Sequence, residues 1–351
     1  MKAKKDYYIE QQLRHIVNNK MKKIIYSLLA IISIFIVWVG IAIFPFFTVE
    51  KLPRNFPSVS NIPEDIDSYL QQKESEVSDI FPNAEKKIYW NNNTKDKTKY
   101  SIVFVHGFTT TGYQSKDFLN KLSRELNSNL YITRLSGHGV SYEGTKEMQI
   151  DKIMHDVSEA IIIGERIGEN VVLIGHSLGG ALSMLAANDE LLSKKIDTLV
   201  LFAPGNSGLS PFAFMNTLIS SFVDRTGNLC WLIDCDPRSF MELPEDEKWE
   251  NYFATDFDTS IFYQIARIPF ATDSISYDTL STSALVFYDE NDQLVSAGKL
   301  KSIFNKWPAK KKVVSIETSE TDRGRHMFPS IANSHLDDFF ISEVVDWLDS
   351  N

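Results

Sequence analysis

A serine between two glycines, placed where an apolar run gives way to a helix-forming stretch, constrains the fold of this chain more than any other feature. The run Val171–Ile174 leads into Gly175-His176-Ser177-Leu178-Gly179, and the helix-forming residues Ala181–Ala187 follow. This pattern predicts a strand, a sharp turn and a helix, because glycines leave room for the strained turn that lifts a serine hydroxyl above a sheet. We therefore predict that Ser177 is a nucleophile; the alternative is a glycine-rich structural turn.

From about residue 85 onward, short apolar runs alternate with amphipathic segments. Such alternation is typical of βαβ units, and the β-branched and aromatic content fits strands that are buried on both faces. The predicted fold class is therefore α/β, with a mostly parallel sheet flanked by helices. The predicted strands are residues 101–105, 129–133, 170–174, 198–203, 283–288 and 312–316, and a last helix covers about residues 336–348.

Residues 206–281 interrupt this alternation. The segment contains 13 aromatic residues and no run that resembles a strand, and it is longer than a connection between a strand and a helix requires. We interpret it as an inserted helical lid, whose aromatic residues either line an apolar pocket or form the lid's own core. Cys230 and Cys235 lie within it, as a disulfide if this part of the chain is exported or as two free thiols.

The nucleophile needs a base. A serine hydroxyl reacts well only when an adjacent base takes its proton, and that base needs a carboxylate to fix its tautomer. Two histidines follow Ser177: His326 in a loop after the last predicted strand, and His335 at the start of the last helix. We favour His326, because a loop at the carboxyl end of a parallel strand can reach over the sheet. His335 is expected to be a helix-start or surface residue.

The carboxylate partner has three candidates. Asp289, Glu290 and Asp292 all follow the predicted strand 283–288. We favour Asp292, because Val295 three residues later can turn the chain back into the next helix. Asp289 and Glu290 are more simply solvated turn residues, and they remain alternatives as the partner of the histidine.

Acyl transfer also needs donors for the negative charge that develops on the carbonyl oxygen, and two backbone N–H groups can supply them. We predict that one belongs to Leu178, which follows Ser177 at the start of the helix. The other is predicted to belong to Phe108, in the sequence His106-Gly107-Phe108 after the predicted strand 101–105. Gly107 allows a close approach of the backbone, and His106 is expected to be structural.

Residues 24–49 form a run of 26 residues without a charge, which is long enough to cross the roughly 30 Å hydrocarbon core of a membrane. The run is longer than the apolar region of a secretory signal and lacks a small-residue cleavage site, so we expect an uncleaved anchor. The alternative is a buried core helix. Seven basic and two acidic residues precede the run, whereas few basic residues follow it closely. This asymmetry predicts a cytoplasmic N-terminus and a catalytic domain on the exported side, periplasmic or extracellular.

Composition excludes several classes of protein. The net charge of −10 disfavours a general nucleic-acid binder, which neutralises phosphates with basic side chains. Two cysteines cannot complete a four-ligand structural zinc site. We expect no cofactor, no metal, no nucleic acid and no obligate protein partner.

These motifs together resemble the α/β-hydrolase superfamily, and more closely its monoglyceride lipase and carboxylesterase branch, over about residues 85–350. The resemblance rests on His106-Gly107-Phe108, Leu135-Ser136-Gly137-His138-Gly139, Gly175-His176-Ser177-Leu178-Gly179-Gly180, Asp292 with Val295, and His326. It implies the α/β-hydrolase fold, a lid at residues 206–281, a catalytic triad and an oxyanion hole. The implied residues are Ser177, Asp292 and His326 for the triad, and Phe108 and Leu178 for the oxyanion hole.

Two features depart from the family pattern. Asp289 stands where a glycine often precedes the acid loop, and the N-terminal anchor has no counterpart. The expected organisation is a basic cytoplasmic segment at 1–23, a transmembrane anchor at 24–49, a proline-punctuated linker or pre-domain segment at 50–84 and a hydrolase domain at 85–351.

The expected function is that of a membrane-anchored serine hydrolase. It would cleave carboxylic esters through an acyl-enzyme intermediate, with an ester or lipid-like small molecule as substrate. A thioesterase, an acyltransferase or a peptidase could use the same residues, and a non-catalytic binding protein could retain the fold.

Overall fold

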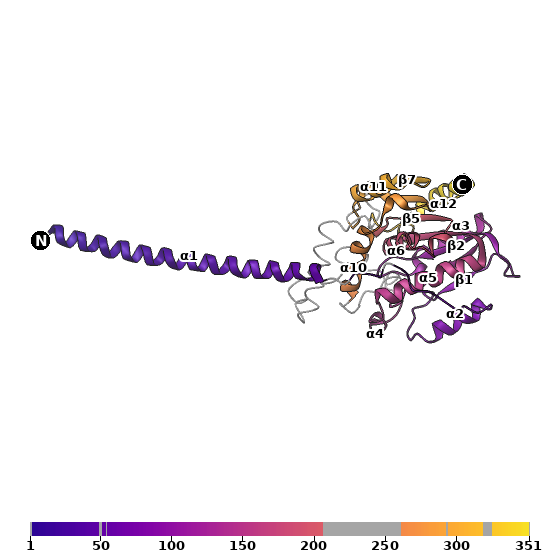
Figure 1. Cartoon of the computed structure of the whole chain (residues 1–351), viewed down its shortest axis with the longest axis horizontal. Coiled ribbons are helices and arrows are strands. Elements are labelled where there is room, and N and C mark those ends of the chain that lie inside the picture. The colour runs from indigo at the N-terminus through magenta and orange to yellow at the C-terminus, as the bar shows by residue number, and fades with distance from the viewer. Residues whose placement is uncertain are drawn as a thin grey trace. The chain divides into compact units, whose positions relative to one another are not determined.

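The computed structural model describes residues 2–48, 51–53, 55–205, 261–292, 294–318 and 325–350. The chain divides into two compact units, Met1–Val49 and Glu50–Asn351 (Figure 1). Most of the predicted lid, residues 206–260 with Cys230 and Cys235, lies outside the described residues.

The first unit is one helix, α1 (Lys2–Thr48), which continues from the basic segment into the apolar run without a break. Within it, Val17–Trp38 has a mean hydropathy of 1.9, and its side chains are exposed. By length and composition this stretch could cross a membrane or act as a signal sequence. It overlaps the run predicted at residues 24–49.

The second unit is built on a seven-stranded sheet in the order β1-β3-β2-β4-β5-β6-β7. β1 is antiparallel to β3, and the other neighbouring pairs are parallel. The predicted α/β fold and all six predicted strands are confirmed, whereas β1 has only three residues, too few to show a pattern. The strands are β1 (Lys87–Tyr89), β2 (Thr98–Val105), β3 (Asn129–Ile132), β4 (Gly168–His176), β5 (Thr198–Phe202), β6 (Ser283–Asp289) and β7 (Lys311–Ile316).

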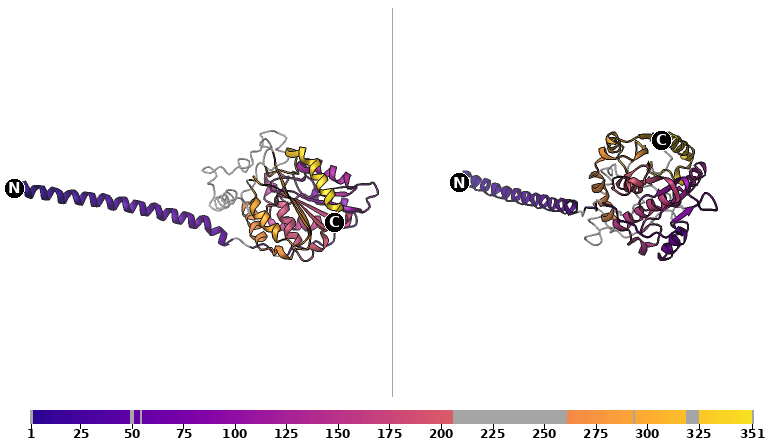
Figure 2. Two further views of the ribbon diagram at one scale, coloured as in Figure 1. Left: turned by 90° about the horizontal axis from the view of Figure 1, so that it is seen from above. Right: turned by 45° about the vertical axis from the view of Figure 1, so that its right-hand side comes forward.

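Helices cover both faces of this sheet (Figure 2). The described α-helices of the second unit are α2 (Ile66–Ser75), α3 (Lys116–Glu125), α4 (Tyr142–Thr145), α5 (Ile150–Ile167), α6 (Leu178–Ala187), α10 (Ile261–Asp273), α11 (Ala297–Lys306) and α12 (Asp337–Asp349). The short 3₁₀ helices are η1 (Gly112–Ser115), η2 (Ser193–Lys195), η4 (Tyr277–Thr279) and η5 (Ile331–Leu336).

Alternate residues of the central strands enter two separate cores. In β2, Val103 and Val105 belong to the core that contains the apolar faces of α5, α6 and α11. Ile102 and Phe104 belong to the opposite core, with α3 and α12. This alternation follows from the two-residue period of a strand, and burial on both faces explains why the central strands are apolar throughout.

Residues 55–84, for which we predicted a linker or a pre-domain segment, belong to the second unit. Ile66 and Leu70, four residues apart on α2, are buried in the same core as α5. Phe56 is buried as well, and its N–H donates to Asp189 Oδ2 at 2.9 Å. The prolines that suggested a linker all precede α2, so a short helix with one apolar face remains possible after them.

The described end of the predicted lid, residues 261–281, contains α10 and η4. α10 lies against α6. Ile261 and Ile268 of α10 and Tyr277 of η4 are buried in the core that contains α5 and α6. This part of the insertion therefore packs on the domain itself.

The strand order changes direction at β2. β2 lies between β3 and β4, so the chain turns to one side of β2 and later crosses to the other. α/β proteins bind ligands at the carboxyl ends of strands at such a switch point. β2 and β4 end side by side, with Val105 opposite Gly175, so His106 and Ser177 emerge at the same place.

Candidate active site

The turn that carries Ser177 lies between β4 and α6. Ser177 has φ 50° and ψ −115°, a conformation that costs a residue other than glycine about 1–3 kcal/mol. Two hydrogen bonds hold it: Ser177 N–H donates to the Phe202 carbonyl, and Gly205 N–H donates to the Ser177 carbonyl, both at 2.9 Å. Gly179 is required because a Cβ there would lie 2.0 Å from the Val105 carbonyl oxygen. The strand, turn and helix predicted around Ser177 are therefore present.

His326 and Asp292 reach this turn from the loops after β7 and β6. His326 Nδ1–H donates to Asp292 Oδ2 at 2.7 Å, and His326 Nε2 accepts from the Ser177 hydroxyl at 2.7 Å. The side chains of His326 and Asp292 are 7% and 3% exposed. The structure thus joins the three predicted triad residues in one hydrogen-bonded chain, in the order that general-base activation of a serine requires.

The other carboxylates after β6 have different partners. Asp289 accepts from the N–H of Asn291 at 2.7 Å, and from the N–H and hydroxyl of Thr318 at 3.1 and 2.6 Å. Glu290 accepts from the Tyr288 hydroxyl at 2.8 Å. Asp289 therefore joins β6 to the residues after β7, and Asp292 is the carboxylate that contacts His326.

The two predicted oxyanion donors lie beside the same turn. Leu178 is the first residue of α6, where an N–H has no carbonyl partner within the helix. Phe108 follows Gly107, at which a Cβ would lie 2.9 Å from His176 Nδ1 and 3.3 Å from Ser177 Cβ. Glycine therefore lets the loop approach the turn closely. The role of the two N–H groups as donors stays a prediction.

Two buried histidines support the loop of Phe108. His106 Nδ1–H donates to the Gly107 carbonyl at 2.9 Å, and its Nε2 accepts from Leu135 N–H at 3.0 Å. The His138 ring contacts His106 and Phe108 with centroid distances of 5.0 and 6.3 Å. Burial lowers the pKa of His106 well below its usual range and that of His138 to about 4, so both rings are neutral at pH 7.

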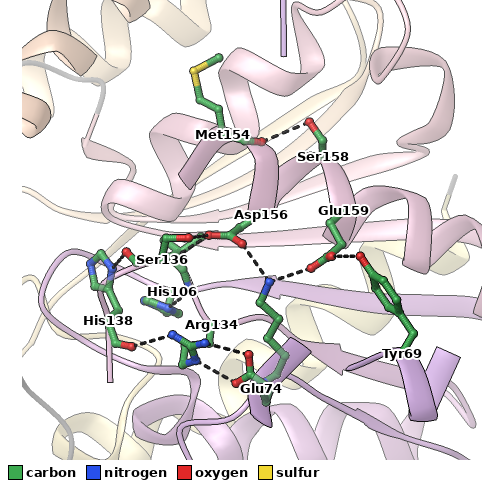
Figure 3. Close-up of polar contacts among 12 residues, drawn as sticks. Tyr69, Glu74, His106, Arg134, Ser136, His138, Met154, Asp156, Ser158 and Glu159 are labelled. Atoms are coloured by element: carbon green, nitrogen blue, oxygen red, sulfur yellow. Dashed lines mark hydrogen bonds and ion pairs between the residues drawn. The ribbon is translucent and has the colours of Figure 1, made fainter. Parts of the chain in front are cut away.

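Behind these loops lies a buried charged network, drawn in Figure 3. Lys86 Nζ donates to Asp156 at 2.8 Å and to Glu159 at 2.7 Å. Asp156 Oδ2 accepts from the N–H and the hydroxyl of Ser136 at 2.6 and 2.7 Å, and Glu159 accepts from the Tyr69 hydroxyl at 2.6 Å. Burial alone would lower the pKa of Lys86, but the neighbouring Asp156, Tyr131 and Glu159 together raise it, so the amine is charged.

The charged network reaches the site through Ser136. The Ser136 carbonyl accepts from His138 Nδ1–H at 3.1 Å, and the His138 ring lies against Phe108. A second ion pair joins Arg134 to Glu74 of α2, with two contacts of 2.8 Å (Figure 3). The segment before the hydrolase domain thus helps to hold a loop at the edge of the site.

The charged network was not predicted from the sequence. Asp156 and Glu159 lie three residues apart among the buried apolar positions of α5, and that pattern was the available signal, because buried carboxylates need a partner. Lys86 gave no such signal, since it is 70 residues from Asp156 in the chain.

The sequence of this domain matches a known protein family and two curated proteins that are named esterase/lipase. Residues 102–334, more than half of the chain, match the model of a family described as the alpha/beta hydrolase family. The chain is 25% identical over 225 residues to esterase/lipase 3 of Mycoplasma pneumoniae, which covers 62% of this chain and 77% of that protein. It is 31% identical over 111 residues to esterase/lipase 2 of the same organism, which covers 31% of this chain and 40% of that protein.

Solved structures share the fold at lower identity. One, from work on the metagenome-derived lipolytic enzymes LipS and LipT, has a TM-score of 0.57 and 16% identity over 78% of this chain and 100% of that one. A soluble variant of monoglyceride lipase from Saccharomyces cerevisiae has a TM-score of 0.52 and 14% identity over 78% of this chain and 97% of that one. Because the family model matches more than half of the sequence, the chain belongs to the alpha/beta hydrolase family, and it resembles the lipase and esterase branch of that family.

Proposed function

We propose that this protein is a serine hydrolase that cleaves carboxylic esters through an acyl-enzyme intermediate. The observation that carries the proposal is the pair of 2.7 Å hydrogen bonds from Ser177 to His326 and from His326 to Asp292, with Ser177 on a strained turn at the carboxyl end of β4. The names of the curated relatives favour an ester over a thioester, an amide or transfer to another acceptor.

In the first half of the reaction, the Ser177 oxygen attacks the carbonyl carbon of the ester while its proton passes to His326 Nε2. Asp292 holds the imidazole in the tautomer that leaves Nε2 free, and it stabilises the imidazolium that forms. The N–H groups of Phe108 and Leu178 stabilise the charge on the carbonyl oxygen. His326 then gives the proton to the departing alkoxide, so the alcohol leaves and the acyl group stays on Ser177.

Water completes the cycle. His326 takes a proton from the water molecule as its oxygen attacks the acyl carbon, and the second tetrahedral intermediate collapses with return of that proton to Ser177. The carboxylic acid leaves, and the enzyme regains its starting state. The substrate class is an ester or a lipid-like small molecule.

A fluorophosphonate probe tests this assignment, because it phosphonylates only an activated serine. The full chain should be labelled, and Ser177→Ala should not be. A panel of p-nitrophenyl esters from acetate to palmitate should be hydrolysed by the wild-type protein, and the chain length with the highest kcat/KM would define the acyl preference. Equal labelling of the two proteins would contradict an enzymatic role for Ser177.

We further propose that α1 anchors the hydrolase in a membrane, with residues 1–23 in the cytoplasm and residues 85–351 on the exported side. The exposed apolar side chains of Val17–Trp38 support an anchor. Exposure of so many apolar side chains to water is unfavourable, whereas the hydrocarbon core of a membrane would bury them. The excess of basic residues before the apolar run supports the orientation.

Protease treatment of intact cells tests this topology. A protease added outside, after permeabilisation of any outer membrane, should release a catalytic fragment that hydrolyses p-nitrophenyl esters. A chain that is fully protected until the inner membrane is broken would reverse the orientation. Recovery of all activity in the soluble fraction, without α1, would instead indicate a cleaved signal sequence.

A further inference from the structure

His176, the last residue of β4, has both ring nitrogens engaged although it is buried. Its Nε2–H donates to the main-chain carbonyl of His326 at 2.9 Å, and its Nδ1 accepts from the side-chain amide of Gln114 at 3.3 Å. A carbonyl oxygen can only accept, so the first bond requires the proton on Nε2. Nδ1 of the neutral ring then carries a lone pair, which the Gln114 amide satisfies.

The His176 ring is uncharged in the folded protein. Burial, together with the neighbouring His326, lowers its pKa to about 3. This matters because the two rings lie 5.3 Å apart between centroids, and His326 must become an imidazolium in every turnover. An uncharged donor can fix the position of the base without a positive charge that would oppose its protonation.

Consecutive residues of one strand end therefore hold His326 at two points. Ser177 contacts its side chain, and His176 contacts its main chain. The following part of the loop has anchors of its own: the Ser115 hydroxyl donates to the Pro329 carbonyl at 2.5 Å. That contact holds the loop after His326, whereas His176 forms a hydrogen bond with His326 itself.

We propose that His176 is a positioning residue, which holds the main chain of His326 so that its imidazole stays within hydrogen-bonding distance of Ser177. The Gln114 amide donates to Nδ1 of the tautomer that makes this contact. The inference rests on the proposed function of Ser177 and His326. His176 acts through His326 and does not take part in the proton transfers.

Two variants, His176→Gln and His176→Asn, place the same amide group in the buried site at different distances from the main chain, so together they distinguish positioning from packing. In His176→Gln the amide nitrogen can occupy the place of Nε2 and still donate to His326. In His176→Asn the shorter side chain reaches only the place of Nδ1, so it can meet Gln114 but not His326. Misplacement of a catalytic group by about 1 Å costs on the order of 10²-fold in rate. We expect kcat to fall about 10²-fold in His176→Asn with KM within about twofold, and we expect His176→Gln to stay within about threefold of wild type.

The measurement uses the full chain in detergent, with p-nitrophenyl ester kinetics and the unfolding midpoint of each variant. Similar midpoints with different kcat values would support positioning. Equal kcat values in the two variants, whether high or low, would overturn it. If His176→Asn does not fold, Gln114→Met leaves the ring in place but removes the donor to its Nδ1, so the ring is held less firmly and kcat should fall several-fold at unchanged KM. Wild-type kcat in that variant would overturn the proposal.

Hydrogen exchange gives an answer that does not depend on catalysis. The amides of Met327 and Phe328, next to the carbonyl that His176 holds, should exchange faster in His176→Asn than in His176→Gln. Unchanged exchange in both variants would show that the contact does not hold the loop. Unaltered ester hydrolysis by Ser177→Ala, by contrast, would defeat the proposed function and leave this exchange result interpretable.

Discussion

The two sides of the site are held in different ways, although both lie at the carboxyl edge of the same sheet. On the base side, Ser177 and His326 are fixed by strand ends, backbone hydrogen bonds and the neutral ring of His176. On the other side, which we name the oxyanion side after the proposed donors Phe108 and Leu178, the loops of Phe108 and Ser136 are backed by the charged network around Lys86. One carboxylate, Asp292, contacts the base, and it belongs to the proposed chemistry.

The difference follows from what each side must do. In the proposed mechanism His326 gains and loses a proton in each turnover, so an additional positive charge beside it would oppose that step. A backbone N–H donor does not titrate, so ion pairs can lie nearby. Neutral His106 and His138 separate the loop of Phe108 from those charges. We therefore expect substitutions on the base side to change the rate, and substitutions in the charged network to change stability.

The largest expected effect is on the base side. Asp292→Asn should lower kcat about 10⁴-fold, because the amide favours the wrong tautomer of His326 and cannot stabilise the imidazolium. Steady-state ester hydrolysis measures this loss, and the unfolding midpoint should change little by comparison.

Asp289→Asn is the matched control, since it makes the same change three residues earlier. It weakens the contacts with Asn291 and Thr318 and should cost about 1–3 kcal/mol of stability with kcat within a few-fold of wild type. If Asp289→Asn lowers kcat more than Asp292→Asn, the assignment of the acid is wrong.

A smaller effect is expected in the charged network. Lys86→Met leaves the carboxylates of Asp156 and Glu159 buried without their cation, so the free energy of unfolding should fall by about 3–5 kcal/mol. Urea unfolding measures it, and the kcat of the folded fraction should stay within a few-fold of wild type. The same substitution in an exposed pair, Lys146→Met opposite Glu143, should cost less than about 1 kcal/mol. A loss of rate without loss of stability in Lys86→Met would contradict this division of roles.

The smallest effect is shared by both sides, because each contains buried neutral histidines. In the unfolded chain a histidine binds a proton below about pH 6.5, whereas folded His138 and His176 do so only below about 4 and 3. Between these values the unfolded state binds more protons, so the free energy of unfolding falls as the pH is lowered, by about 1.4 kcal/mol per pH unit for each histidine.

Urea unfolding at pH 7, 6 and 5 measures this slope. His138→Phe on the oxyanion side and His176→Gln on the base side should each make the slope shallower by about one proton. A slope that stays the same in either variant would show that the ring is protonated in the folded protein or that its pKa is not lowered.

The proposed site residues could be selected from the sequence because each lies in a segment that follows a strand. Ser177, His326 and Phe108 follow β4, β7 and β2, and parallel strands bring their carboxyl ends to one edge. The choice between Asp289 and Asp292 was harder, because both follow β6. Only the path of the chain decides it: Asp289 points to Thr318, and Asp292 points to His326.

The supporting contacts could not be predicted in the same way. Gln114 and His176 are 62 residues apart, and their pairing depends on a 3₁₀ helix whose position no local pattern gives. α2 was not predicted because the prolines before it suggested a linker, and β1 was not predicted because its three residues are too few to show a pattern. Periodicity reveals elements, but long-range polar pairs appear only once the elements are packed.

The distance along the chain between nucleophile and base has a consequence for biosynthesis. Ser177 and His326 are 149 positions apart, and a ribosome that adds about 5–20 residues per second needs roughly 7–30 s to pass from one to the other. During that interval the nascent protein carries the hydroxyl of Ser177 without the imidazole that, in the proposed mechanism, activates it. By the proposed mechanism, the emerging polypeptide therefore cannot hydrolyse esters until its final segment has been synthesised and has joined the sheet.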